Sequence, residues 1–263
     1  MSKRHDSSAG PRKAVIRAGN PPGSQSTRYG AGRGQDRRNA GVVTSRFEPR
    51  KKLLTYNYGN RGHWYQFANI IESVKSPYQQ ITFAQHSDFG KCLILDNDLM
   101  SSERNGEYDE AMISLMPPGA KRILILGGGD GSLAARLGRH VKITMVEQDM
   151  MVRKLSKKHF GISMGGNVTE MFCDAHWVVS VLNSPFDVVF CDLPDEIPIG
   201  IYRQLRAKLP GASFIAQTGS DTRRLLCGDL LVKRIKSICP DALTISRFIP
   251  DFMEHWTFTY FHA

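Results

Sequence analysis

The sequence predicts an α/β protein in which a doubly wound sheet follows a small antiparallel β unit. Three observations predict this fold. A short apolar strand over residues 123–126 runs directly into a glycine-rich turn at 127–131. Strands and helices then alternate toward the C-terminus, as is typical of a sheet covered by helices on both faces. Before this region, residues 53 to about 104 contain short strands separated by turns, which is typical of antiparallel pairing.

The first 52 residues differ from the rest of the chain in charge and composition. They contain 13 Lys or Arg against 3 Asp or Glu, so they carry the whole net charge of +10. They are rich in Gly, Ser and Pro and bury too little apolar surface to offset their chain entropy, so we expect a disordered basic tail. Three roles stay open: a solvated tail, weak salt-sensitive binding of nucleic acid or another polyanion, and an organellar transit peptide, which the missing amphipathic face disfavours.

Residues 53–117 are expected to form an N-terminal β domain and a connecting helix. Strands over 64–74, 80–85 and 91–95 are separated by turn signals at 76–77 and 88–90. The sequence Asp-Asn-Asp at 96–98 predicts a hairpin turn. The helix of residues 107–116 is expected to stop at Pro117 and Pro118, because proline lacks the amide hydrogen that a helix needs.

Residues 118–263 are expected to form a nucleoside-binding domain. Ligands in doubly wound sheets bind beyond the carboxyl ends of the strands, so the residues that follow each strand are the candidates for a site. The predicted strands are 123–126, 143–146, 168–172, 187–191 and 213–217, the helices between and after them are 132–140, 149–160, 175–182, 199–209 and 221–239, and strands 243–249 and 256–261 are expected to pair at the sheet edge.

The glycine turn and Glu147 together indicate a nucleoside site. Gly127 and Gly129 suit a backbone that takes positive φ or touches a ligand. Glu147 ends the neighbouring strand 20 residues after Gly127, where a carboxylate can accept from both ribose hydroxyls. Asp130 within the turn would repel phosphate and suits a cationic group, such as the sulfonium or amine of an S-adenosylmethionine relative. A tight turn with no ligand is the alternative, which Glu147 disfavours.

More carboxylates follow the next two strands. Asp174 follows one strand, and Asp192 and Asp195 follow the other. Each has a plain structural alternative, because Asp174 could cap a helix and the pair could be turn residues around the intervening proline. The carboxyl ends of parallel strands meet at one edge of a sheet, so we expect these residues to join Asp130 and Glu147 on one acidic rim.

These residues resemble the spermidine/spermine synthase family of polyamine aminopropyltransferases. The resemblance covers roughly residues 64 to 261, and its upstream half separates it from general methyltransferases. It implies an N-terminal β domain on a Rossmann-like, methyltransferase-type domain, and commonly a homodimer. The matching motifs are Leu126-Gly-Gly-Gly-Asp-Gly131, Glu147, Cys173-Asp-Ala175, Asp192-Leu-Pro-Asp195, Ser76-Pro-Tyr-Gln79, Phe89-Gly90, Leu95-Asp96, Tyr108-Asp-Glu110, Gln217 and Ile249-Pro-Asp-Phe252.

The resemblance implies that the aminopropyl donor is decarboxylated S-adenosylmethionine, used as a co-substrate, with no prosthetic group. Gln79 and Asp130 would hold the aminopropyl part of the donor. Asp130 would pair with its free amine, which also disfavours the carboxylate of ordinary S-adenosylmethionine. Glu147 would bind the ribose, and Asp174 the adenine amine.

The resemblance also implies roles toward the acceptor, an amine such as putrescine. Asp192 would be the base, and Tyr108, Asp195 and Gln217 would position the polyamine. An amine must be neutral to attack, and a carboxylate beside the attacking nitrogen can accept its proton. A sulfonium is already a good leaving group, so positioning is most of the task, and we expect no metal.

Three positions depart from the family pattern. Asp109 stands where the family usually has His or Gln after the tyrosine, and Glu196 replaces the proline that usually follows the second aspartate. Phe252 stands where a tyrosine often helps to hold the polyamine. The departures concern the acceptor, whereas the residues assigned to the donor are intact.

Two other functions stay open on sequence grounds. The first is a methyltransferase-like enzyme that uses S-adenosylmethionine, which Asp130 disfavours. The second is a non-catalytic family member with a nucleic-acid-binding tail, which the presence of both Asp192 and Asp195 disfavours. Five scattered cysteines favour a reducing compartment, and no apolar run reaches 18 residues, so we expect a cytoplasmic protein without a membrane span.

Overall fold

The structure, a computed structural model, describes residues 51–58, 61–104, 106–194, 197–222 and 230–263. The chain divides into two units, Met1–Arg46 and Phe47–Ala263, and the description below concerns the second. The predicted tail lies outside the described residues except at its end. The predicted end of the tail at residue 52 is wrong by two residues. Lys51 and Lys52 already belong to the first strand, where they pair with Phe67 and Gln66 of the second strand.

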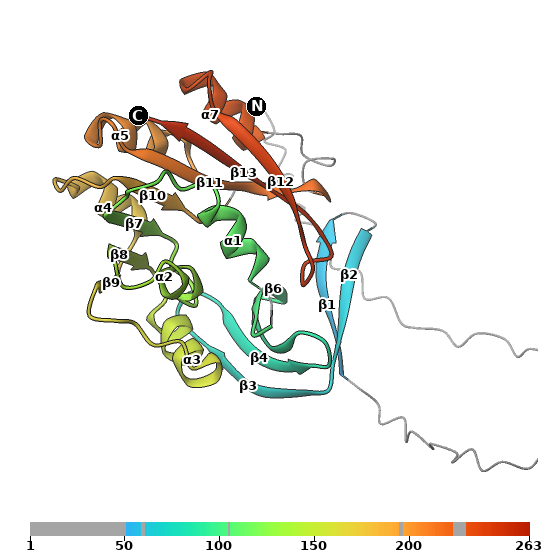
Figure 1. Cartoon of the computed structure of the whole chain (residues 1–263). Helices are drawn as coiled ribbons and strands as arrows, with labels where there is room; N and C mark the ends of the chain where they lie inside the picture. Colours follow the sequence, from blue (N-terminus) through green and yellow to red (C-terminus); the bar gives the residue numbers. More distant parts are fainter. Residues whose placement is uncertain (1–50, 59–60, 105, 195–196, 223–229) are drawn as a thin grey trace, which may run out of the picture. The chain divides into compact units, whose positions relative to one another are not determined.

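The larger sheet has seven strands in the order β12-β13-β11-β10-β7-β8-β9 (Figure 1). Neighbours among β7 to β11 are parallel, whereas β13 is antiparallel to both β11 and β12. This confirms the predicted doubly wound sheet with a paired C-terminal edge. The strands are β7 (Arg122–Leu126), β8 (Lys142–Glu147), β9 (Val168–Phe172), β10 (Val188–Cys191), β11 (Ser213–Ser220), β12 (Leu243–Ile249) and β13 (Glu254–His262).

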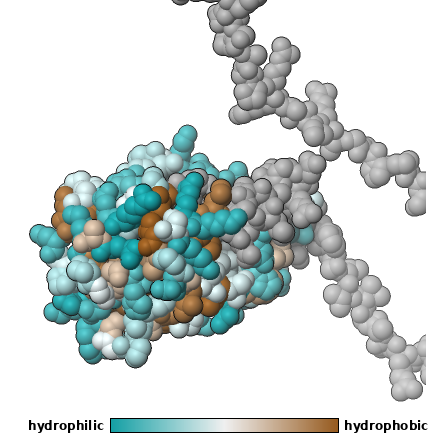
Figure 2. Space-filling model, turned by 90° about the horizontal axis from the view of Figure 1, so that it is seen from above, coloured by the Kyte–Doolittle hydropathy of each residue, from teal (hydrophilic) through white to brown (hydrophobic). Residues whose placement is uncertain are grey.

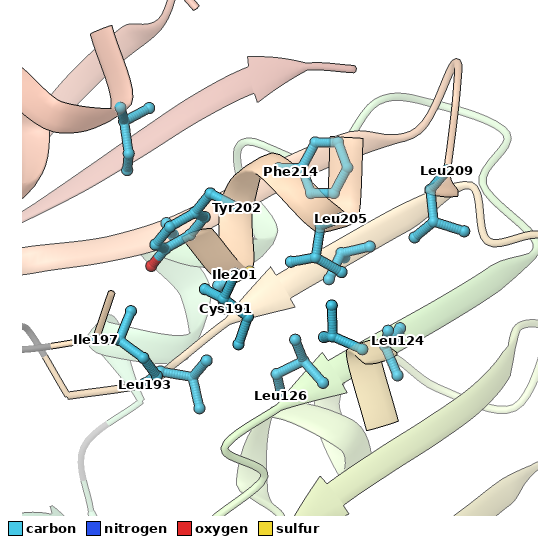
Figure 3. Packing of buried hydrophobic residues seen from close by; sticks show 14 of the residues in the cluster. Leu124, Leu126, Cys191, Leu193, Ile197, Ile201, Tyr202, Leu205, Leu209 and Phe214 are labelled. Carbon is cyan, nitrogen blue, oxygen red and sulfur yellow. The ribbon is translucent and has the colours of Figure 1, made fainter. Parts of the chain in front are cut away.

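Helices cover both faces of this sheet, and the alternation of side chains along the strands divides the core in two. Leu124 and Leu126 of β7 pack with α4, α5 and α7, in the cluster that Figure 3 shows. Ile123 and Ile125 pack on the opposite face with α1 and α2. Burial on both faces explains why these strands are uninterrupted apolar runs. The helices are α1 (Glu107–Ile113), α2 (Ser132–Arg136), α3 (Met150–Phe160), α4 (Ala175–Val181), α5 (Ile199–Lys208) and α7 (Leu230–Ile238).

The N-terminal region forms two antiparallel sheets instead of one. The hairpin of β1 (Lys51–Tyr58) and β2 (Arg61–Phe67) is one sheet, and β3 (Asn69–Lys75), β4 (Gln80–His86), β5 (Gly90–Leu95) and β6 (Asp98–Ser102) are the other. The predicted single strand over 64–74 is therefore wrong, because the chain bends at Ala68 and changes sheet. The hairpin turn is confirmed: Asp96 and Asn97 have φ of 47° and 78°, as a two-residue β-turn with both central residues left-handed requires.

Two predicted helices are shorter in the structure. The helix predicted over 132–140 ends at Arg136, and Gly138 follows it with φ of 79°, which is left-handed and cannot continue a helix. The helix predicted over 107–116 ends at Ile113, before the prolines. Of the helix predicted over 221–239, residues 223–229 lie outside the described residues, and α7 accounts for its second half.

The four-stranded sheet packs against the larger one through two apolar clusters. Phe83 and Leu93 contact Val152 and Leu155 of α3. The other cluster contains apolar residues of β2, β4, β5 and β6. They pack with Ile249 and Phe252, which lie at the β12–β13 turn. On the outside, Figure 2 shows a face on which hydrophilic side chains predominate, with smaller hydrophobic groups among them. The boundary predicted between residues 117 and 118 falls inside a single compact unit and stays a prediction.

Candidate active site

A cavity of about 910 Å³ opens at the carboxyl ends of β7, β8 and β10. The strand order reverses between β7 and β10, and such a reversal is where doubly wound sheets bind their ligands. The four-stranded sheet, α1 and the β12–β13 turn complete the wall. Eight of the ten predicted site residues line this cavity: Gln79, Tyr108, Gly127, Gly129, Asp130, Glu147, Asp192 and Gln217.

The glycine turn has the backbone that the sequence predicts. Gly127, Gly129 and Gly131 have φ of 84°, 51° and 89°, all left-handed. A side chain at Gly127 would also collide with the backbone carbonyl of Asp192 at the end of β10. The glycines therefore let two strand ends approach each other closely, which brings the turn and Asp192 to the same cavity.

Glu147 is held beneath the glycine turn by two backbone amides. Gly129 N donates to Oε2 and Asp149 N donates to Oε1, both at 2.8 Å. Burial raises the pKa of Glu147 above its ordinary value, and the amide hydrogen bonds oppose this rise. Each carboxylate oxygen can accept more than one hydrogen bond, so the fixed carboxylate still suits the two hydroxyls of a ribose.

Asp149, to which the sequence gave no role beyond starting a helix, connects the two halves of the cavity. Its Oδ2 accepts from Ser76 Oγ at 2.6 Å and from Gln79 Nε2 at 3.1 Å, whereas its Oδ1 caps α3 by accepting from Met151 N at 3.0 Å. The side chain is almost fully buried. Asp149 thus fixes Gln79, from the turn between β3 and β4, against the part of the cavity that lies at the end of β8.

Asp130 is a buried carboxylate whose position is set from both sides of the turn. Its Oδ1 accepts from Ser132 N at 2.8 Å, and its backbone carbonyl accepts from Arg153 Nη1 at 3.4 Å. Arg153 is buried and pairs with Glu170, so the turn rests on a fixed guanidinium. These contacts place the carboxylate of Asp130 at the cavity wall.

Tyr108 and Asp192 form a direct pair. The Tyr108 hydroxyl donates to Asp192 Oδ1 at 2.6 Å, from α1 to the end of β10. The tyrosine ring packs edge-on against Phe252, Trp256 and Phe258, with ring centroids 5.9, 5.7 and 5.1 Å away. This aromatic wall fixes the hydroxyl, and through it the carboxylate that the sequence predicts as the base.

Gln217 lines the cavity, but its amide is bonded to the backbone. Nε2 donates to the Leu193 carbonyl, and Oε1 accepts from Gly219 N at 3.1 Å. In this arrangement Gln217 holds the segment that follows Asp192. Its predicted contact with a polyamine stays a prediction.

Of the remaining two predicted residues, the structure describes only Asp174. Asp174 Oδ1 accepts from His176 N at 2.6 Å and Trp177 N at 3.2 Å, so it caps α4, as the structural alternative proposed. Its neighbours Cys173 and Ala175 line the cavity, whereas Asp174 is not among the lining residues. The role of Asp174 toward adenine stays a prediction. Asp195 and Glu196 lie outside the described residues.

Besides Asp149, two other buried carboxylates, Asp109 and Asp251, line the cavity without a role from the sequence. Burial raises the pKa of Asp109 from 3.8 to about 7, with a further contribution from the charge of Asp130. Asp251 is buried at the β12–β13 turn and accepts from Ser102 Oγ at 3.0 Å. From the sequence, Asp109 was noted only as a departure from the family pattern, and Asp251 only as part of the matching motif Ile249-Pro-Asp-Phe252.

Among the described residues, no group of three or more His, Cys, Asp or Glu side chains could hold a metal ion. In the same part of the chain, no helix is long and apolar enough to cross a membrane.

The fold and the cavity define a class: a Rossmann-like protein with a cleft that is lined by carboxylates and therefore suits a cationic ligand. The chain belongs to the spermine/spermidine synthase family. A model of the spermine/spermidine synthase domain matches residues 110–261, and one of the spermidine synthase tetramerisation domain matches residues 54–103.

Similar proteins of known function agree with this membership. Polyamine aminopropyltransferase 1 of Aquifex aeolicus is 26% identical over 215 residues, which are 74% of this chain and 76% of that protein. A polyamine aminopropyltransferase of Escherichia coli O1:K1 is 29% identical over 178 residues, 60% of this chain. The match spans 62% of the Escherichia coli protein.

Solved structures show the same fold. A spermidine synthase in complex with the transition-state analogue AdoDATO superposes with a TM-score of 0.75 at 21% identity, covering 82% of this chain and 81% of that one. The spermidine synthase of Thermotoga maritima gives 0.74 at 21% identity, covering 82% and 80%.

Proposed function

We propose that this chain is a polyamine aminopropyltransferase, which moves the aminopropyl group of decarboxylated S-adenosylmethionine to an amine such as putrescine. The observation that carries the proposal is that one cavity unites the donor candidates with the Tyr108–Asp192 pair. Family membership supports the same activity.

The donor is assigned to the half of the cavity beneath β7 and β8. Glu147 takes the ribose hydroxyls, and the left-handed turn at Gly127 and Gly129 lets the nucleoside approach the backbone. Asp130 pairs with the primary ammonium of the donor, and Gln79 contacts the aminopropyl chain. A carboxylate at position 130 repels the carboxylate of ordinary S-adenosylmethionine, which supports the decarboxylated donor over a methyltransferase reaction.

The transfer itself needs little beyond positioning and a base. The acceptor ammonium gives its proton to Asp192, and the nitrogen lone pair attacks the methylene next to the sulfonium. The carbon–sulfur bond breaks, and its electron pair stays on sulfur, so the leaving group is the neutral thioether methylthioadenosine. Tyr108 orients Asp192, and Asp195 and Gln217 are assigned to hold the polyamine. No metal takes part in this scheme.

Two proposals concern the rest of the molecule. The basic residues 1–52 are proposed to bind polyanions such as nucleic acid weakly, because they carry the net positive charge of the chain. The protein is proposed to act as a homo-oligomer, a homodimer at least, on the grounds that residues 54–103 match a domain described as a tetramerisation domain.

The test is incubation of the full chain with either donor and a panel of amines, with mass spectrometry of the products. We expect methylthioadenosine and an acceptor that is heavier by one aminopropyl group, with decarboxylated S-adenosylmethionine alone. Methylated acceptor formed from ordinary S-adenosylmethionine would overturn the proposal, as would the absence of transfer to every amine tested.

A further inference from the structure

Another carboxylate, Asp109, lines the cavity together with Asp130 and Asp192, to which the proposed reaction gives roles. It is carried by α1, directly after Tyr108, and is 9% exposed. Its Oδ2 lies 3.2 Å from Nε of Arg136 on α2, and the Ser132 side chain hydrogen-bonds to it. Asp109 of α1, Asp130 of the glycine turn and Asp192 after β10 thus interact with one another at the cavity wall.

The charges that face Asp109 come from each of these elements. Asp130 and Asp192 disfavour its ionised form, with Asp130 the stronger, whereas Arg136 favours it. Burial adds the largest effect, and the pKa of Asp109 rises to about 7. The Arg136 side chain is 39% exposed and also contacts Glu110 Oε1 at 3.4 Å, so solvent and a second carboxylate weaken its hold on Asp109.

An ammonium group placed in this cavity would change that balance. It would be largely desolvated, close to two or three carboxylates, and opposite in charge to all of them. Attraction between such a cation and a buried carboxylate is several-fold stronger than at the surface, because little water screens it. The donor of the proposed reaction carries a primary ammonium on its aminopropyl group, and Asp130 is its assigned partner.

We propose that Asp109 shares the donor's primary ammonium with Asp130, and that donor binding near neutral pH displaces a proton from Asp109 to solvent. The inference rests on the proposed function. The balance is simple: the protonated carboxyl of Asp109 becomes a carboxylate, one proton leaves to the buffer, and the donor ammonium keeps its own protons. Asp109 is then a donor-specificity residue within the Tyr108-Asp-Glu110 motif.

The consequence is a donor affinity that depends on pH. Because the ionised form of Asp109 binds the cation better, the affinity should increase as pH rises from 6 to 8. If the bound donor lowers the pKa of Asp109 by about one unit, the dissociation constant should fall by roughly fivefold over that range. Ligands without an ammonium, such as methylthioadenosine, should show no such dependence.

Isothermal titration calorimetry at pH 7, in buffers of different ionisation enthalpy, measures the protons exchanged on binding. The full chain is compared with Asp109→Asn, which keeps the shape, and with Glu110→Gln, which removes the other carboxylate on Arg136. Decarboxylated S-adenosylmethionine and methylthioadenosine are the two ligands. The expected result is release of roughly half a proton with the decarboxylated donor, as a group with a pKa near 7 requires. Release should persist in Glu110→Gln and vanish in Asp109→Asn.

The outcomes separate this inference from the function on which it rests. If the wild type binds the decarboxylated donor without proton release, or Asp109→Asn still releases protons, the role of Asp109 is overturned and the proposed function stands. If the wild type and Asp109→Asn both bind methylthioadenosine but neither binds the decarboxylated donor, the proposed function and this inference are both wrong.

Discussion

The hydrogen bond between Tyr108 and Asp192 allows a sharp test of how the proposed base is positioned. The hydroxyl donates to Asp192 Oδ1 at 2.6 Å, and the tyrosine ring packs edge-on against three aromatic rings. Tyr108→Phe removes the hydroxyl and keeps the ring. Asp192→Asn keeps the shape of the side chain and removes its ability to accept a proton. Each change therefore isolates one half of the pair.

The expected magnitudes follow from the strength of these interactions. A hydrogen bond to a charged group contributes about 1.5–3 kcal/mol, so its loss in Tyr108→Phe should lower turnover by roughly ten- to 150-fold. Loss of the base in Asp192→Asn should lower turnover by roughly 10²- to 10⁴-fold. The double variant should be no slower than Asp192→Asn alone, because Tyr108 is expected to act through Asp192.

The assay measures turnover of the wild type, both single variants and the double variant with saturating decarboxylated S-adenosylmethionine and amine. Affinity for methylthioadenosine is the control, and it should be nearly unchanged in all four proteins. Turnover of Asp192→Asn near that of the wild type would refute the role of Asp192 as the base. If the two losses simply multiply in the double variant, Tyr108 contacts the substrates on its own account and does not work through the carboxylate.

Three further predictions follow from other parts of the structure. In Asp130→Ala, calorimetry should find that the preference for decarboxylated over ordinary S-adenosylmethionine is largely lost; equal affinities in the wild type would contradict the role of Asp130. The pKa of Asp109 is raised in the folded state to about 7, so its contribution to stability is present below pH 4 and is lost as pH rises toward 7. Urea unfolding at pH 5 and pH 8 should therefore show a smaller loss of stability in Asp109→Asn than in the wild type, and equal losses would argue against the raised pKa. A chain that begins at Phe47 keeps β1 and should retain transferase activity, while any nucleic-acid binding of the full chain, measured at low and high salt, should disappear.

The sequence alone was sufficient to predict the larger sheet, because each of its central strands has a recognisable residue pattern. Residues 123–126 and 188–191 are apolar throughout, as burial on both faces requires, and turn residues border them. The pattern was less informative where tertiary contacts decide the structure. No glycine or proline lies between Trp64 and Val74, yet the chain leaves one sheet at Ala68 and enters another.

The convergence of several predicted site residues on one cavity was also predictable, because these residues follow strands in order along the chain. Gly127, Asp130 and Glu147 converge as a direct consequence of parallel pairing between β7 and β8. Asp174 shows the limit of this reasoning. A residue after a strand can face the ligand or cap the next helix, and spacing alone does not distinguish these two uses. In the structure the side chain of Asp174 makes the capping hydrogen bonds.

The other half of the cavity is assembled from segments that are distant in sequence. Asp109 comes from α1, whereas Asp251 comes from the β12–β13 turn, which is distant in sequence, and there Ser102 of β6 donates a hydrogen bond to Asp251. No local pattern could indicate that these carboxylates line the same cavity as Asp192. Both are nevertheless buried, and burying a carboxylate is costly unless it is hydrogen-bonded or faces a cation. Phe252 removes one hydroxyl from the part of this half that the β12–β13 turn forms, and Asp251 gives the same part a carboxylate, which suits an amine better than a hydroxyl does. The composition of this wall therefore favours a cationic acceptor despite the departures from the family pattern.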